Sequence, residues 1–142
     1  MRVSVRGKHA VTTLIYVVTR TSPNPVTQSE ISQATHISAS YLETLLSGLR
    51  KADILRGGKG PKAALYLGAK GAEVSIAEIV RAVDPEYLDA LGNDTSASHI
   101  VTSELSKSMS DQFIARLEEI TIQSWVRHNQ QRMQVAERRK PQ

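Results

Sequence analysis

The feature that most constrains the fold is a stripe of leucines that runs into a glycine-rich stretch. The leucines recur three and four positions apart, which places them on one face of a helix between Ser38 and Lys51. The opposite face carries short polar side chains, so only one side of this helix can pack into a core. The leucines are Leu42, Leu45, Leu46 and Leu49, and the polar positions are Ser40, Tyr41, Glu43, Thr44 and Ser47.

Two short strands are predicted on either side of the glycine-rich stretch, over residues 54–56 and 64–67. A short helix over about residues 27–34 precedes the leucine helix, with Thr27 and Glu30 in capping-box positions. Two helices joined by so tight a turn predict a helix-turn-helix, and the hairpin adds a wing beside it.

The rest of the chain is predicted to be mostly helical. Ser75 and Glu78 repeat the capping-box pattern and predict another helix that ends at Val83. The other predicted elements are a first helix over 4–20, an irregular linker over 85–98, a long helix over 100–120, a final short helix from Thr121 and a frayed basic tail from Gln130.

The sequence therefore predicts a mainly α fold with a small β-hairpin wing: a winged helix-turn-helix followed by a long C-terminal dimerisation helix. A chain of 142 residues has room for one small domain and a helical arm. The expected divisions are a winged helix-turn-helix DNA-binding domain over residues 1–83, a linker over 84–99, and a dimerisation helix with a basic tail over 100–142.

The long helix has an apolar stripe that one small winged domain lacks the surface to bury. We expect it to pair with a second copy of the chain, since two-fold symmetry suits a palindromic site. The alternative is that the stripe folds back on its own domain. The residues predicted for dimerisation are Val101, Leu105, Met109, Phe113, Leu117 and Ile120.

Charge is unevenly distributed. Residues 1–62 carry nine Lys/Arg and three Asp/Glu, residues 63–126 carry four and ten, and the remaining residues carry five and one. The basic part thus coincides with the predicted helix-turn-helix and wing. This is the distribution expected of a phosphate-binding surface, and the alternative is a solvated basic face.

The polar face of the leucine helix is suited to the DNA major groove, since its side chains are short and carry donors and acceptors. Glu43 is expected to accept from a cytosine amino group, or alternatively to close a capping box with Ser40. Tyr41 contacts DNA or closes the turn with its ring. The predicted DNA-binding residues are Ser38, Ser40, Tyr41, Glu43 and Thr44 on the helix and Arg56, Lys59, Pro61 and Lys62 on the wing.

Several classes of site are excluded or unsupported. The chain has no cysteine, which excludes disulfides, thiolate-held metals and cysteine nucleophiles. No acidic residue is spaced with a histidine, nucleophile or phosphate loop, so we predict no catalytic residues, metal site or cofactor. Trp125 is expected to pack in the core, or alternatively to line a small-molecule pocket with Phe113. No apolar stretch has membrane-spanning length and no cleavage site follows the N-terminal segment, so we expect a cytoplasmic protein that does not contact membranes.

Ordered stretches of this sequence resemble the IscR-type winged-helix regulators of bacteria, a family that includes NsrR and CymR. The resemblance covers residues 1 to about 83. It is carried by residues 1–4 (MRVS), 7–10 (GKHA), 37–43 (ISASYLE), 49–52 (LRKA), 66–68 (YLG) and 76–84 (IAEIVRAVD).

The resemblance implies sequence-specific transcriptional control. It places the five helix residues named above in the major groove and Lys59 and Pro61 in the minor groove. Lys59 stands where relatives commonly have arginine, which has a planar fork that lysine lacks. Relatives that bind an iron–sulfur cluster hold it with three cysteines before the long helix. This chain has none there, and His99 alone cannot hold such a cluster.

The leading hypothesis is a homodimeric bacterial regulator, a repressor, that binds a palindromic double-stranded DNA operator without an iron–sulfur cluster. The alternative is a protein-binding regulator whose winged domain docks a partner enzyme or regulator. Three alternatives stay open for the signal: the protein senses a partner protein, senses a small ligand, or senses no signal.

Overall fold

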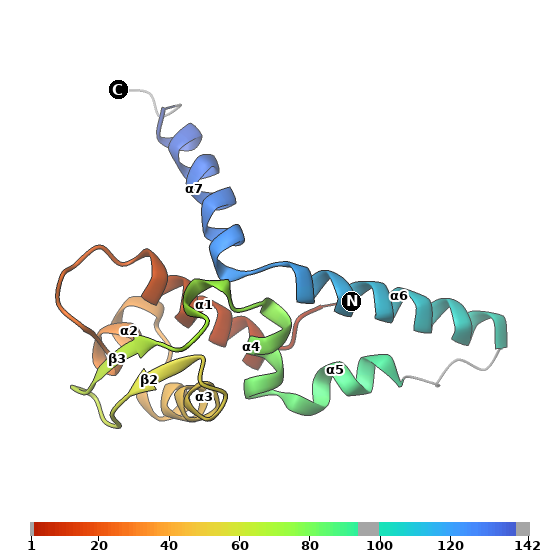
Figure 1. The fold of residues 1–142 in the computed structure, drawn as a ribbon, viewed down its shortest axis with the longest axis horizontal. Helices are drawn as coiled ribbons and strands as arrows, with labels where there is room; N and C mark the ends of the chain where they lie inside the picture. Colours follow the sequence, from red (N-terminus) through yellow and green to blue (C-terminus); the bar gives the residue numbers. More distant parts are fainter. Residues whose placement is uncertain (1, 94–99, 139–142) are drawn as a thin grey trace.

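The computed structural model describes residues 2–93 and 100–138, which form seven α-helices, one 3-10 turn and a three-stranded sheet (Figure 1). The prediction of a mainly α fold with a small β-hairpin wing is confirmed. The elements are α1 Val5–Thr19, β1 Val26–Thr27, α2 Gln28–Thr35, α3 Ala39–Lys51, β2 Leu55–Gly57, β3 Ala64–Leu67, the 3-10 turn η1 Gly71–Glu73, α4 Ile76–Val83, α5 Pro85–Gly92, α6 Ile100–Glu119 and α7 Ile122–Arg138.

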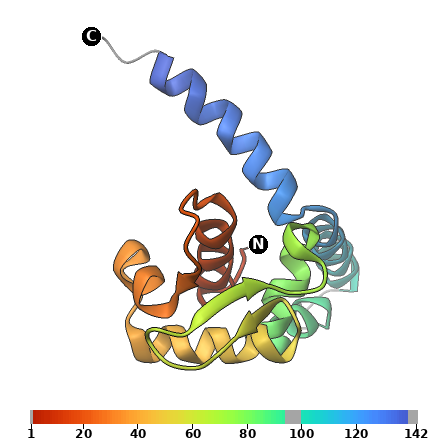
Figure 2. The same ribbon diagram turned by 60° about the vertical axis from the view of Figure 1, so that its left-hand side comes forward.

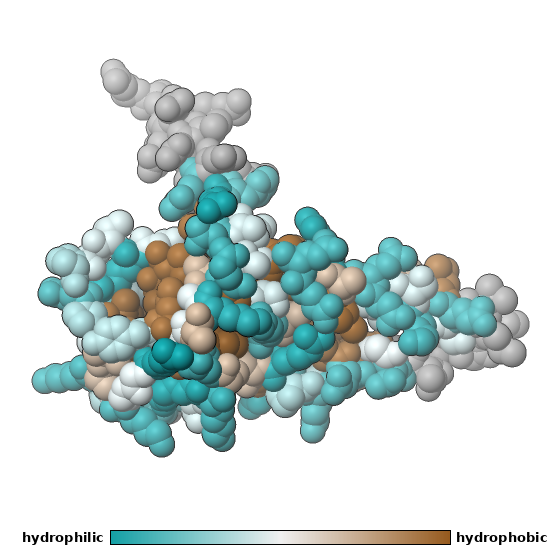
Figure 3. Space-filling view, in the orientation of Figure 1, coloured by the Kyte–Doolittle hydropathy of each residue, from teal (hydrophilic) through white to brown (hydrophobic). Residues whose placement is uncertain are grey.

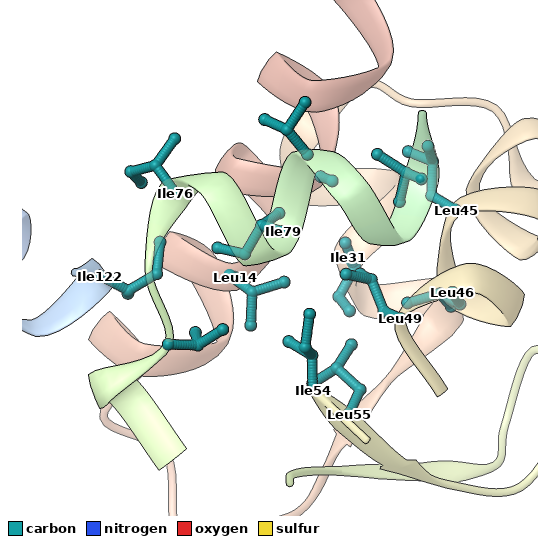
Figure 4. Packing of buried hydrophobic residues seen from close by; sticks show 14 of the residues in the cluster. Leu14, Ile31, Leu45, Leu46, Leu49, Ile54, Leu55, Ile76, Ile79 and Ile122 are labelled. Carbon is teal, nitrogen blue, oxygen red and sulfur yellow. The ribbon is translucent and has the colours of Figure 1, made fainter. Parts of the chain in front are cut away.

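The core forms where the leucine face of α3 meets the other helices (Figure 4). All four leucines are at most 1% exposed, which confirms that the stripe is a packing face. Burial of this kind supplies the main favourable free energy of folding, at about 25 cal/mol per Å² of apolar surface. The core cluster that contains the leucines also includes side chains from other elements, among them Leu14, Ile31, Leu55, Ile79 and Ile122.

The wing belongs to a sheet with strand order β1-β3-β2, in which both pairs are antiparallel. Leu55 lies opposite Leu67, and Gly57 lies opposite Leu65. The hairpin was predicted, but β1 was not. Val26 pairs with Leu65 across a long sequence separation, and two residues are too few for a recognisable alternation. This third strand joins the wing to the start of α2.

The two predicted capping boxes differ in outcome. The Ser75 hydroxyl accepts from the Glu78 amide at 3.1 Å, and the Glu78 carboxylate accepts from the Ser75 amide at 2.8 Å, which confirms that box. Thr27 also caps its helix, by accepting from the Glu30 amide at 3.2 Å. The prediction of a complete box there is wrong, because the Glu30 carboxylate pairs with Arg20 at 2.6 Å instead.

Glu78 makes stability depend on pH. A hydrogen bond from Lys70, helped by the one from the Ser75 amide, holds the pKa of the Glu78 carboxyl below its ordinary value. This contribution is complete above the unfolded pKa of about 4.3 and is lost as the pH falls through the lowered folded value. We expect Glu78→Gln to lower the free energy of unfolding by about 0.5 kcal/mol at neutral pH, and by less at about pH 3. Urea unfolding at both pH values checks this.

The exposed Glu73, in the neighbouring turn η1, provides the control. For Glu73→Gln, which removes a carboxylate that takes no part in the contacts of Glu78 with Lys70 and Ser75, we expect little change in the free energy of unfolding at neutral pH. The prediction for Glu78→Gln would be contradicted if the difference in free energy of unfolding between this variant and the wild-type protein were the same at both pH values.

The predicted irregular linker is wrong over its first half, because Pro85–Gly92 forms the helix α5. Pro85 lies in its first turn, where a proline costs no hydrogen bond. Leu88 is 2% exposed, and Tyr87 and Leu91 pack against the core cluster. The turn-forming residues Pro85 and Gly92 therefore lie at the two ends of a helix. Residues 94–99, including His99, lie outside the described residues.

The apolar stripe of the long helix is divided between core and surface. Leu117 is 6% exposed, and Phe113 and Ile120 pack against the core cluster of their own chain. Leu105 and Met109 are 60% and 54% exposed. The fold-back alternative thus holds for the C-terminal half of the helix, which corrects the dimerisation role expected of Phe113, Leu117 and Ile120. The N-terminal half presents large apolar side chains, and its pairing with a second copy stays a prediction. The side chain of Val101 lies outside the described residues.

The last helix is longer than expected. The prediction of a short helix followed by a frayed tail from Gln130 is wrong, because α7 continues to Arg138. This helix projects from the rest of the protein (Figures 1 and 2). The expectation that Trp125 packs in the core is also wrong, since its side chain is 39% exposed. Among the helices of the described residues, none has the length and hydropathy to cross a membrane.

Candidate nucleic-acid interface

The turn between α2 and α3 is fixed by three local features. His36 ends α2 in the left-handed conformation, at φ 59°. The Ser32 hydroxyl donates to the Ile37 carbonyl at 2.6 Å. Gln28, 5% exposed, donates through Nε2 to the Ala39 carbonyl at 3.1 Å. These contacts join the start and the end of α2 to the beginning of α3, and so determine how α3 is presented.

The polar face of α3 points outward. Ser38, Ser40 and Thr44 are exposed, and Tyr41 and Glu43 are half-buried. Ser38 is the N-cap residue, yet among the described residues its hydroxyl makes no capping hydrogen bond. The hydroxyl therefore remains available to a ligand. The structure brings the five predicted helix residues together along one side of α3.

Tyr41 has a partner that the sequence did not indicate. Its hydroxyl lies 3.1 Å from Nδ1 of His9 in α1, and the two rings meet edge to face with centroids 5.4 Å apart. This contact holds the Tyr41 ring at the edge of the polar face, with one side packed and the other accessible. The two roles considered for Tyr41, closing the turn and contacting DNA, are therefore compatible.

Glu43 forms an ion pair with Arg50, two helical turns further along α3. The alternative in which Glu43 closes a capping box with Ser40 is wrong, because its carboxylate faces the C-terminal half of the helix. The side chains are 35% exposed for Glu43 and 13% for Arg50. The predicted contact of Glu43 with a cytosine stays a prediction.

The wing presents cations at its tip. Lys59, Pro61 and Lys62 are exposed, and neither ammonium forms an ion pair with any residue that the structure describes. Two backbone positions allow the tight hairpin: Gly57 at φ 133° and Gly60 at φ 102°, a region that side-chain-bearing residues rarely adopt. The wing thus exposes two positive charges to solvent, as a phosphate-binding element would.

Arg56 is held differently from the two lysines. Its guanidinium donates two hydrogen bonds to Asp53, at 2.7 and 2.9 Å, and these lower the pKa of the Asp53 carboxyl. Asp53 lies in the turn after α3, at φ 56°. Arg56 is therefore exposed but already paired at the base of the wing, whereas Lys59 and Lys62 lie near the tip.

The wing and α3 are connected, so they face a ligand together (Figure 2). Arg50 of α3 donates to the Gly58 carbonyl at 3.3 Å. On the other side of the loop, the Ser29 amide at the start of α2 donates to the Pro61 carbonyl at 2.9 Å. The wing loop is thus tied to both helices of the helix-turn-helix.

Sequence reasoning did not single out His9, Arg50 or Asp53. The spacing of Glu43 and Arg50 offered a signal, because residues seven apart lie on one face of a helix. The spacing of Asp53 and Arg56 offered none, since these residues belong to a turn and a strand. The contact of His9 with Tyr41 joins two helices, and only the tertiary structure shows it.

Comparison with known proteins assigns the family. The family model described as "Rrf2: Iron-dependent Transcriptional regulator" matches residues 3–128. The chain belongs to the Rrf2 family of transcriptional regulators. It is 32% identical to the HTH-type transcriptional regulator IscR of Cronobacter sakazakii, over 97% of this chain and 87% of that protein. The IscR of Photorhabdus laumondii is 34% identical, over 97% and 86%.

Solved structures of similar proteins have the same fold. The global cysteine regulator CymR of B. subtilis superposes with a TM-score of 0.73 at 20% identity, covering 90% of this chain and 98% of that one. The IscR of T. potens superposes with a TM-score of 0.69 at 19% identity, covering 100% and 93%. The resemblance to IscR-type regulators is thus confirmed, and this Rrf2 chain belongs to a family of regulators rather than enzymes.

The iron in the family description raises the question of whether this Rrf2 chain could hold it. The cysteines that hold a cluster in related regulators have no counterpart, since the sequence contains none. Within residues 2–93 and 100–138, no three His, Asp or Glu side chains are grouped as metal ligands. The described side chains therefore do not fit an iron–sulfur cluster.

Proposed function

We propose that this Rrf2 protein is a transcriptional repressor that binds a palindromic operator as a homodimer, without an iron–sulfur cluster. The observation that carries the proposal is the joint presentation of two surfaces. The hydroxyl-rich face of α3 and the wing both face solvent, and Arg50 of α3 joins them through the Gly58 carbonyl. Lys59 and Lys62 of the wing form no ion pair with a described residue. The helix suits the major groove, and the wing suits the adjacent minor groove.

DNA would be read by several different contacts. Ser38 donates to a phosphate, which positions the protein without reading sequence. Ser40, Tyr41 and Thr44 meet base edges and the sugar-phosphate backbone, whereas Glu43, paired with Arg50, is held back from the phosphates. Lys59 and Lys62 neutralise phosphates beside the narrow groove, with Pro61 packing against its wall. Arg56 contributes through its charge at the base of the wing.

Selection of bound sequences from random duplexes tests this proposal. We expect the bound pool to contain an inverted repeat, with half-sites about one helical turn apart. Binding should weaken steeply as salt rises, since neutralised phosphates release counterions. A pool without any enriched sequence, at low salt and high protein concentration, would contradict the proposal.

The proposed dimer uses the exposed half of α6. Leu105 and Met109 are more than half exposed, and acidic Glu104 and Asp111 lie near them in sequence. A groove with a volume of about 590 Å³ lies elsewhere on the same chain, between α1 and the base of α7. Its walls are largely apolar, as Figure 3 shows beside the base of α7, and Arg2 and Lys8 are basic. A largely apolar groove with basic side chains suits the apolar Leu105 and Met109 with Glu104 beside them, so we place α6 of a second copy there.

Replacing Leu105 and Met109 with aspartate should convert the dimer to monomers at low micromolar concentration, because the interface would then bury unpaired charge. Affinity for a duplex with two half-sites should fall about a hundredfold, since the two contacts are no longer linked. Light scattering gives the mass, and fluorescence anisotropy gives the affinity.

Thr21→Asp together with Asn24→Asp is the matched control. These two exposed positions add the same negative charge in the loop between α1 and β1, at the other end of the protein from α6 (Figure 1). The control should remain dimeric. A Leu105→Asp/Met109→Asp protein that stayed dimeric would refute this interface.

A further inference from the structure

One polar contact links the recognition helix α3 to the wing. Arg50 lies on the flank of α3 beside the hairpin, and its side chain is only 13% exposed. Its guanidinium donates to the Glu43 carboxylate and, at 3.3 Å, to the Gly58 carbonyl. A cation so well covered is stable only while its partners stay in place, because an unpaired buried charge is costly. The positions of the helix side chain and of the wing are therefore coupled.

The same contact shields the charge of Glu43. One carboxylate oxygen accepts from Arg50, while Oε2 is inaccessible to solvent and has no hydrogen-bond partner among the described residues. The carboxylate is thus folded against the junction of helix and wing. Without Arg50, nothing described here would hold it there, and a charged group prefers water to an apolar surface. It would then extend from the face that meets phosphates.

We propose that Arg50 is a positioning residue for DNA binding: it holds Glu43 folded and neutralised, and it fixes the wing, so that α3 and the hairpin meet a duplex as one surface. This inference rests on the proposed function, because it presumes that this surface binds DNA. It assigns Arg50 no contact with DNA. The effect is exerted through Glu43 and Gly58.

Arg50→Met tests the inference, since methionine keeps an unbranched apolar side chain and a good helix propensity. We expect affinity for the selected duplex to fall about tenfold, through repulsion between the released Glu43 and phosphates. Adding Glu43→Gln to Arg50→Met should recover most of the lost affinity for the duplex. A merely structural role of Arg50 would give no such rescue. A direct phosphate contact would instead lower the salt dependence by about one unit, also without rescue.

The control is Arg81→Met, which removes an ion pair with Glu118, at 2.8 Å, that involves neither the polar face of α3 nor residues 58–63 of the wing loop. Its affinity for the duplex should equal that of the wild-type protein. Circular dichroism melting of each variant separates misfolding from altered binding. Equal affinity of Arg50→Met and wild type, or a loss that Glu43→Gln leaves unchanged, would overturn the inference while the proposed function stands.

A second readout does not need DNA. Nitrogen-15 relaxation of the free protein should show greater mobility of the wing amides, residues 58–63, in Arg50→Met and unchanged mobility in Arg81→Met. Unchanged wing mobility would refute the coupling of helix and wing, even if the wild-type protein bound no duplex. Absence of wild-type binding would itself refute the proposed function.

Discussion

Replacing Lys59 and Lys62 with glutamate is expected to lower the affinity for the selected duplex by roughly a hundredfold. Each change removes an attraction to phosphate and adds a repulsion. Both side chains are exposed and unpaired within the described residues, so the fold should lose little stability. The slope of log affinity against log salt should fall by about two, since two fewer phosphates are neutralised. Fluorescence anisotropy over a range of salt concentrations measures both quantities.

A matched control changes the net charge by the same amount elsewhere. Arg116 and Arg127 are exposed on α6 and α7, away from α3 and the wing. Arg116→Glu with Arg127→Glu should reduce affinity only slightly, through the long-range field of the protein. Equal losses in the two double variants would mean that net charge, rather than a wing contact, governs binding.

Leu46→Ala is expected to lower the free energy of unfolding by about 2–5 kcal/mol, the usual cost of truncating a core leucine. Leu46 is fully buried at the centre of the α3 stripe, so the change leaves a cavity in the core cluster (Figure 4). This is a large part of the stability of a domain of this size, typically about 5–15 kcal/mol. Urea unfolding followed by circular dichroism gives the change.

Val5→Ala serves as the comparison, because Val5 is 67% exposed in the first turn of α1 and alanine favours helix. It should alter the free energy of unfolding by less than about 0.5 kcal/mol. A cost for Leu46→Ala below about 1 kcal/mol would show that α3 is not packed as described.

The parts of the fold that the sequence predicts well depend on local patterns. The leucine periodicity of α3 gives both its length and its buried face. The Ser75–Glu78 box locates the start of α4, because both of its hydrogen bonds join residues three apart. The hairpin is recognisable because glycines separate two apolar runs. In each case the determining contacts lie within a few residues of sequence.

The errors arise where distant residues compete with local ones. The Glu30 carboxylate binds Arg20 rather than completing its own capping box. β1 exists only because β3 pairs with it. α5 contains Pro85 and Gly92, which read as turn formers, but they occupy its two ends while Leu88 is buried. Beyond Val126, α7 is mostly polar and has few apolar residues by which to predict how far it continues.

The candidate interface shows the same difference between features set by local sequence and features set by distant contacts. The hydroxyls of α3 and the lysines of the wing could be named from the sequence, because the helix and the hairpin determine which way they point. The tie between Arg50 and Gly58 could not, since it joins two elements whose relative position is set by the whole core. The division of α6 into a packed and an exposed half likewise depends on where α4 and α5 lie.

Nuclear magnetic resonance with the nitrogen-15-labelled protein and the selected duplex tests the DNA-binding surface most directly. If α3 and the wing bind DNA together, the largest amide shifts should fall on residues 38–47 and 57–62, with little change along the exposed half of α6. Shifts confined to α6, α7 and the groove beside Trp125, with α3 and the wing unaffected, would contradict this assignment.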